Sequence, residues 1–190
     1  MLCRVVVTCV FMPGMLWAQP APESPPERDK FSVVGTRLIY DTNAAADPAH
    51  REMEPDDAQD LVALLRAHPE ITELQLNSSG GSVWAGREMS RIVTDFELDT
   101  RVDGECASSC TIVFLGGARR SLARGSKLGF HQHTWSAAST QTYYDTYRED
   151  EGWDTPFDFA SWVYSDTQSE IHREMMFMVD RGVHPLFAIK

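Results

Sequence analysis

The chain is poor in positive charge. It has 17 lysines and arginines against 28 aspartates and glutamates, which gives a net charge of −11 over 190 residues. An acidic surface repels the phosphate backbone of nucleic acids and offers no polybasic patch to an anionic membrane. The composition therefore argues against nucleic acid as a partner. No membrane contact is expected beyond a possible uncleaved N-terminal signal.

Long apolar runs are also lacking. The apolar stretch that follows Arg4 ends at Trp17, so it is shorter than the roughly twenty residues that a membrane-spanning helix needs. One basic residue, an apolar run and a small residue at Ala18 form the pattern of a secretory signal. We therefore expect residues 1–18 to be a signal peptide cleaved near Ala18, and the protein to be periplasmic or secreted. An uncleaved anchor is the alternative. Residues 19–30 are rich in proline and glutamate and are expected to be a disordered leader.

Cysteine is scarce, and cleavage would remove half of it. Of the four cysteines, Cys3 and Cys9 lie in the expected signal peptide, which leaves Cys106 and Cys110. A close pair in an oxidising compartment tends to form a disulfide. Residues four apart in a regular helix are poorly oriented for this bond, but it becomes feasible if Cys106 lies just before the helix. We expect the disulfide; two small buried hydrophobic side chains are the alternative.

The rest of the chain, residues 31–190, is expected to be one α/β domain of ordinary size. Strands and helices alternate between residues 71 and 131, which is the pattern of a parallel sheet with crossover connections. Strands are expected over 31–41, 71–76, 100–102 and 128–131, and helices over 57–67, 83–96 and 108–115. Residues 134–154 fit neither the hydrophobic period of a helix nor that of a strand, and they are expected to form an irregular excursion. No internal repeat is present.

A long helix is expected over residues 155–181. Thr155 and Asp158 have the spacing of a helix-capping pair, and Pro156 takes the first helical position. Apolar residues then recur at helical spacing: Phe157, Ala160, Tyr164, Ile171, Met175 and Met178. Gly182 follows as a helix stop.

Three short segments carry residues that suit a single active site. The first ends in Gly80 and Gly81, whose amides can approach a ligand closely because glycine tolerates positive φ. The second places Ser108 where an apolar strand turns into an apolar helix. The third places His131 at the end of a returning strand, near the start of that helix. An oxyanion site, a nucleophile and a base are the parts of a serine acyl-transfer enzyme.

The same segments resemble the proteolytic subunit of Clp protease. Leu76–Gly86 is similar to that family's "INSPGG…AG" stretch, Gly104–Gly117 to its "GQAASMGAFLLAAG", and Phe130–Gln132 to its "IHQP", in the same order. The resemblance implies a Clp/crotonase-like superhelix of ββα units with a mostly parallel sheet. It also implies a homo-oligomer and a peptide or unfolded protein as substrate.

The matched positions imply a role for each residue. Ser108 would be the nucleophile, His131 the base, and the amides of Gly80 and Ser109 the oxyanion donors. From the residues alone, a helix cap is the alternative for Ser108, although capping does not explain the histidine. A plain turn is the alternative for the Gly80–Gly81 pair. The position that matches the family's acidic residue falls after Lys190. The site is therefore expected to work as a Ser–His dyad, to recruit another acid, or to be inactive.

Two other chemistries are less well supported by the residues. His131 and His133 would share a face of a strand, which suits a metal, but no third ligand accompanies them. Lysine is nearly absent, and none of Lys30, Lys127 and Lys190 is placed to act as a lysine base. No metal and no other cofactor is therefore expected.

The sequence thus predicts a secreted serine peptidase-like hydrolase that works without ATP, because the periplasm lacks ATP. A crotonase-like acyl-CoA enzyme would share the fold, but coenzyme A is not expected outside the cytoplasm. A catalytically inactive Clp-like scaffold or peptide-binding oligomer is the second alternative. The absence of the family's acid favours that alternative, and the intact set of serine, histidine and glycines opposes it.

Overall fold

A computed structural model describes residues 30–131, 135–184 and 186 of the chain. The expected signal peptide, most of the expected leader, His133 and Lys190 lie outside the described residues. Within the described ranges, no helix combines the length and the apolar character needed to cross a membrane.

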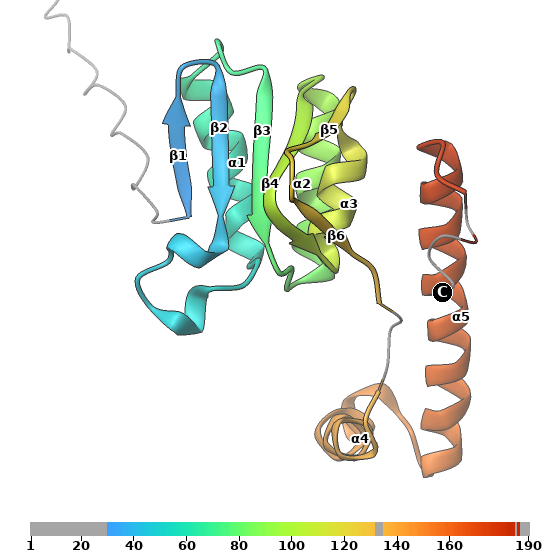
Figure 1. The fold of residues 1–190 in the computed structure, drawn as a ribbon. Coiled ribbons are helices and arrows are strands. Elements are labelled where there is room, and N and C mark those ends of the chain that lie inside the picture. The colour runs from blue at the N-terminus through green and yellow to red at the C-terminus, as the bar shows by residue number, and fades with distance from the viewer. Residues whose placement is uncertain (1–29, 132–134, 185, 187–190) are drawn as a thin grey trace, which may run out of the picture.

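The domain is built around one mixed β-sheet (Figure 1). Its six strands are β1 (Phe31–Val34), β2 (Arg37–Asp41), β3 (Glu73–Ser78), β4 (Asp99–Ala107), β5 (Arg120–Leu122) and β6 (Lys127–Gly129). The strand order is β1-β2-β3-β4-β5, and β6 also pairs with β4. Only β1 and β2 are antiparallel; the other strand pairs are parallel. The expected α/β class with a mostly parallel sheet is therefore confirmed, whereas the short strand β5 was not foreseen.

Three helices lie against this sheet. They are α1 (Pro55–Ala67), α2 (Val83–Asp95) and α3 (Ser109–Gly116), and short 3₁₀ turns occupy Thr42–Ala44 and Pro48–His50. Helix α2 packs between α1 and α3. A Cβ on Gly86 would lie 2.7 Å from the Ser109 carbonyl oxygen, and one on Gly116 would lie 2.7 Å from the Ser90 carbonyl oxygen. The two glycines thus let the backbones of α2 and α3 approach closely.

The hydrophobic core lies between the sheet and these helices. Alternate residues of β3 are buried, as expected for a strand with one face against a core. Fully buried side chains of the core include Leu38, Leu61, Leu74, Leu76, Met89, Val93 and Val102.

Residues 137–151 correct one expectation. The segment expected to be an irregular excursion contains a regular helix, α4 (Ala137–Glu151). Ser136 caps its start by accepting a hydrogen bond from the Ser139 amide, and Gly152, at φ 70°, ends it. None of its residues is buried. The helix therefore lacks the apolar periodicity from which helices are recognised in a sequence.

The last helix, α5 (Pro156–Asp180), begins as the sequence predicted. Thr155 and Asp158 each accept a hydrogen bond from the other's amide, which confirms the capping box. Its first turns pack against α4 through Phe159 and Trp162, which lie near Tyr143 together with Trp153 of the connection between the two helices. Phe157 and Tyr164 are 83% and 66% exposed. The apolar positions of α5 are therefore only partly covered within one copy of the chain.

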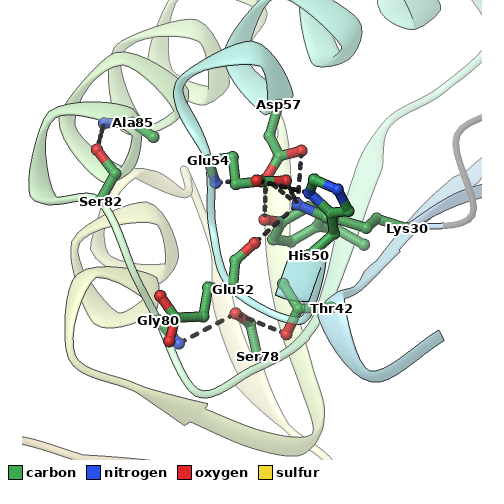
Figure 2. A network of polar contacts seen from close by, with 11 residues as sticks. Lys30, Thr42, His50, Glu52, Glu54, Asp57, Ser78, Gly80, Ser82 and Ala85 are labelled. Atoms are coloured by element: carbon green, nitrogen blue, oxygen red, sulfur yellow. Dashed lines mark hydrogen bonds and ion pairs between the residues drawn. The ribbon is translucent and has the colours of Figure 1, made fainter. Parts of the chain in front are cut away.

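A buried ionic network ties β1 and β2 to the start of α1 (Figure 2). Lys30 Nζ donates to the carboxylates of Glu54, at 2.7 Å, and Asp57, at 3.0 Å. Tyr40, whose pKa is raised well above its usual range mainly by burial, keeps its proton and donates to Asp57 at 2.7 Å. Asp57 has no exposed surface, so the Lys30 ammonium compensates a charge that water cannot reach.

The substitution Lys30→Met should destabilise the fold by about 3–5 kcal/mol, because it leaves the Asp57 carboxylate buried without its cation. Urea unfolding measures the loss. Lys127→Met, at an exposed position, is the control and should change the free energy of unfolding by less than about 0.5 kcal/mol. Equal effects of the two variants would contradict this account.

The same network makes the stability depend on pH. The hydrogen bond from Lys30 lowers the pKa of Glu54 in the folded state. A carboxyl with a lowered folded-state pKa stabilises the protein above its unfolded pKa, and this stabilisation is lost as the pH falls through the folded-state pKa. The difference between wild type and Lys30→Met should therefore shrink in acid.

Candidate active site

The parallel sheet brings the three segments to one edge. Strand β3 pairs with β4, where Ser78 lies opposite Cys106, and β6 pairs with β4, where Gly129 lies opposite Ala107. The carboxyl ends of parallel strands meet at the same edge of a sheet, where α/β proteins place their sites. The residues that follow these three strands therefore meet there.

Ser108 and His131 lie in direct contact at this edge. The Ser108 Oγ is 2.7 Å from the His131 Nε2. The Ser108 amide also donates to the Gly129 carbonyl at 2.9 Å, which fixes the serine to the end of β6, two residues before the histidine. For the serine hydroxyl to donate to Nε2, the ring proton of a neutral His131 must sit on Nδ1.

The backbone at Ser108 has an uncommon conformation. Its φ of 54° and ψ of −131° place a non-glycine residue in the left-handed half of the map, which costs about 1–3 kcal/mol. The side chain makes no capping hydrogen bond to α3; instead, the Thr111 hydroxyl donates to the Ser108 carbonyl at 2.6 Å. Ser108 therefore occupies the N-cap position of α3, but its hydroxyl does not cap the helix. The strained turn directs the hydroxyl to His131.

The backbone of Gly80 lies directly against this turn. Gly80 has φ 100°, and a Cβ there would lie 2.7 Å from the Ser108 Cβ and 3.1 Å from the Ser109 nitrogen. Its amide donates to the Ser78 Oγ at 3.1 Å, and Ser78 in turn accepts a hydrogen bond from Thr42 (Figure 2). The sequence predicts that the Gly80 amide faces an oxyanion. In this structure the amide donates its hydrogen to the buried Ser78 hydroxyl instead.

Gly81 and Ser109 have different surroundings. A Cβ on Gly81 would lie 2.5 Å from the nitrogen and the carbonyl oxygen of Met53, so this glycine permits two chain segments to touch. Ser109 is the first residue of α3, where amides have no acceptor within the helix and the helix dipole is positive. Its hydroxyl is buried and has no hydrogen-bond partner among the described residues. Of the two amides expected to serve as oxyanion donors, the Ser109 amide is therefore the better placed to donate to an oxyanion.

A disulfide joins Cys106 and Cys110 across the turn. Cys106 is the second-last residue of β4 and Cys110 the second residue of α3, so the pair straddles Ser108. This is the arrangement in which the sequence made the bond feasible, with the first cysteine before the helix. Both side chains have no exposed surface.

A small depression surrounds the hydroxyl and the imidazole. Ser108, Ser109 and His131 line it, together with Val83, Thr111, Ile112, Phe130 and Glu174. Glu174 comes from α5 and was not foreseen. The one sequence signal for it is its spacing, one helical turn before the buried Met178.

A larger cavity of about 380 Å³ adjoins the depression. It lies between α2 and α5 and shares Ile112 and Glu174 with the site. Within the described ranges, no group of three or more His, Cys, Asp or Glu side chains is placed to hold a metal ion.

Comparison with known proteins gives a distant structural similarity. No protein-family model matches the chain, and no curated protein matches it either. One solved structure that resembles it is a point mutant of ClpP1 from Listeria monocytogenes, with 16% sequence identity, a TM-score of 0.48 and 72% of each chain covered. Neither the identity nor the TM-score reaches a level that defines a family. The functional proposal therefore depends on the geometry of the site itself.

Thiol titration tests the disulfide. The exported protein, denatured without reductant, should show no free thiol, and reduction should release two thiols from the mature chain. Four thiols after reduction would mean that Cys3 and Cys9 are retained, so that the signal peptide is not cleaved. Two free thiols before reduction in the mature chain, which lacks Cys3 and Cys9, would contradict the bond. Closure of so short a loop is worth about 2 kcal/mol, so reduction should lower the stability only modestly.

Proposed function

We propose that this chain is a serine hydrolase that cleaves peptide bonds, with Ser108 as nucleophile and His131 as base. The observation that carries the proposal is the 2.7 Å contact between Ser108 Oγ and His131 Nε2. A nucleophile within hydrogen-bonding distance of its base is the geometric requirement for this chemistry. The strained turn at Ser108 adds support, because strained backbone conformations concentrate at active sites.

Each step uses groups at this edge of the sheet. His131 Nε2 takes the hydroxyl proton as Ser108 Oγ bonds to the scissile carbonyl carbon. The imidazolium then returns that proton to the leaving amine, and a water molecule activated by the same nitrogen hydrolyses the acyl-enzyme. The Ser109 amide donates to the developing oxyanion, and such a donor is worth about 3 kcal/mol in the transition state.

The compartment and the substrate belong to the same proposal. Export by the signal-like segment at residues 1–18 would place the enzyme in the periplasm, where no ATP-driven unfoldase can feed it. The substrate would then be a short or already unfolded peptide. Membership of the Clp/crotonase superfold, with its ββα superhelix, and assembly into a homo-oligomer are also proposed. The mostly parallel sheet supports the first, and the exposed Phe157 and Tyr164 support the second.

Covalent labelling with a fluorophosphonate tests the proposal. Ser108 should be modified, and Ser108→Ala should abolish the modification. His131→Ala should slow labelling at least about a hundredfold, because an unactivated hydroxyl is a poor nucleophile. Ser109→Ala is the matched control and should label at nearly the wild-type rate, since alanine keeps the backbone amide. Intact mass and peptide mapping give the rate and the site.

Two results would contradict the proposal. Labelling at Ser109 in place of Ser108 would assign the nucleophile to the neighbouring residue. A folded, correctly processed protein that does not label at all would instead support the peptide-binding scaffold.

A further inference from the structure

The structure places a carboxylate at the Ser108–His131 site. Among the described residues that line the Ser108–His131 depression, Glu174 is the one acidic side chain. It is half-buried, whereas Asp180, the carboxylate at the end of the same helix, is exposed.

Contacts on both sides of Glu174 hold this part of α5 against the domain. One turn before it, Glu170 forms an ion pair with Arg87 of α2. One turn after it, Met178 is 2% exposed and belongs to the hydrophobic core. Residues four apart share a face of a helix, so Glu170, Glu174 and Met178 face the domain together.

A further hydrogen bond fixes the end of the helix. The Arg181 guanidinium donates to the Thr94 Oγ1 of α2 at 2.9 Å. The face of α5 that carries Glu174 is therefore anchored beyond the site as well as before it. A carboxylate on an anchored helix can hold an imidazole in one orientation, which a carboxylate on a loose segment cannot.

We propose that Glu174 is the acid of this site, a positioning residue whose carboxylate accepts the Nδ1 hydrogen of His131. This inference rests on the proposed hydrolase function. With Nε2 committed to Ser108, Nδ1 must carry the ring proton, and an acceptor there selects that tautomer. When Nε2 takes the serine proton, Glu174 stays ionised and stabilises the imidazolium. The proton returns from Nε2 to the leaving group, so Glu174 gains and loses none.

The first test compares labelling rates. Fluorophosphonate labelling of Ser108 is followed in wild type, E174Q, E174D and D180N. E174Q should slow labelling about a hundredfold or more, because its amide group favours the wrong tautomer. E174D, which keeps the carboxylate, should recover most of the rate. D180N removes an exposed charge from the same helix and should label as wild type does. An E174Q rate equal to that of D180N would overturn the proposal.

The second test does not depend on activity. Nitrogen-15 NMR of the imidazole reports which ring nitrogen of neutral His131 carries the hydrogen. Wild type should carry it on Nδ1, and E174Q should shift the population toward Nε2. Wild-type His131 protonated on Nε2 would overturn the proposal, even if E174Q failed to fold. Wild type that does not label but has the Nδ1 tautomer, sensitive to E174Q, would refute the hydrolase function and support the role of Glu174.

Discussion

The left-handed turn at Ser108 is the constraint on which the site depends. A serine at φ 54° is held there only because its neighbours leave it no relaxed alternative. Its amide donates a hydrogen bond to the Gly129 carbonyl, and the backbone of Gly80 lies against its Cβ. The Cys106–Cys110 disulfide joins the residues on either side of it. Each contact comes from a different strand end. The strain is therefore maintained by the meeting of three strands rather than by the turn alone.

The meeting of those strands requires a local irregularity in the sheet. The pairing of β3 with β4 shifts between Leu76 and Ser78, so that β4 bulges near Gly104. Gly104 has φ 120°, and a Cβ there would lie 2.3 Å from the Asn77 side-chain oxygen, which accepts the Glu105 amide. Asn77 thus fills the bulge. The bulge redirects the end of β4 toward β6, so the site depends on one asparagine and one glycine that take no part in the chemistry.

Much of this arrangement follows from sequence, for physical reasons. The alternation of strand-like and helix-like segments predicted the parallel sheet. The order of a helix followed by a returning strand predicted that His131 would lie close to Ser108. Helix α4 was missed because it has no buried face, and periodicity detects only helices that have one. The hydrogen bond from the Gly80 amide to Ser78 was not foreseen, because local sequence does not show where a hydroxyl turns. Glu174 is distant along the chain, and its place depends on how α5 docks.

The central claim is that Ser108 and His131 act together as nucleophile and base on a carbonyl held at the start of α3. A crystal structure with a peptidyl boronic acid tests it most directly, because boron forms a tetrahedral adduct with an activated serine. The account predicts a bond from Ser108 Oγ to boron, with one boronate oxygen at the Ser109 amide and the other at His131 Nε2. A boronate bonded elsewhere, or bound without a covalent bond while Ser108 stays hydrogen-bonded to His131, would contradict it.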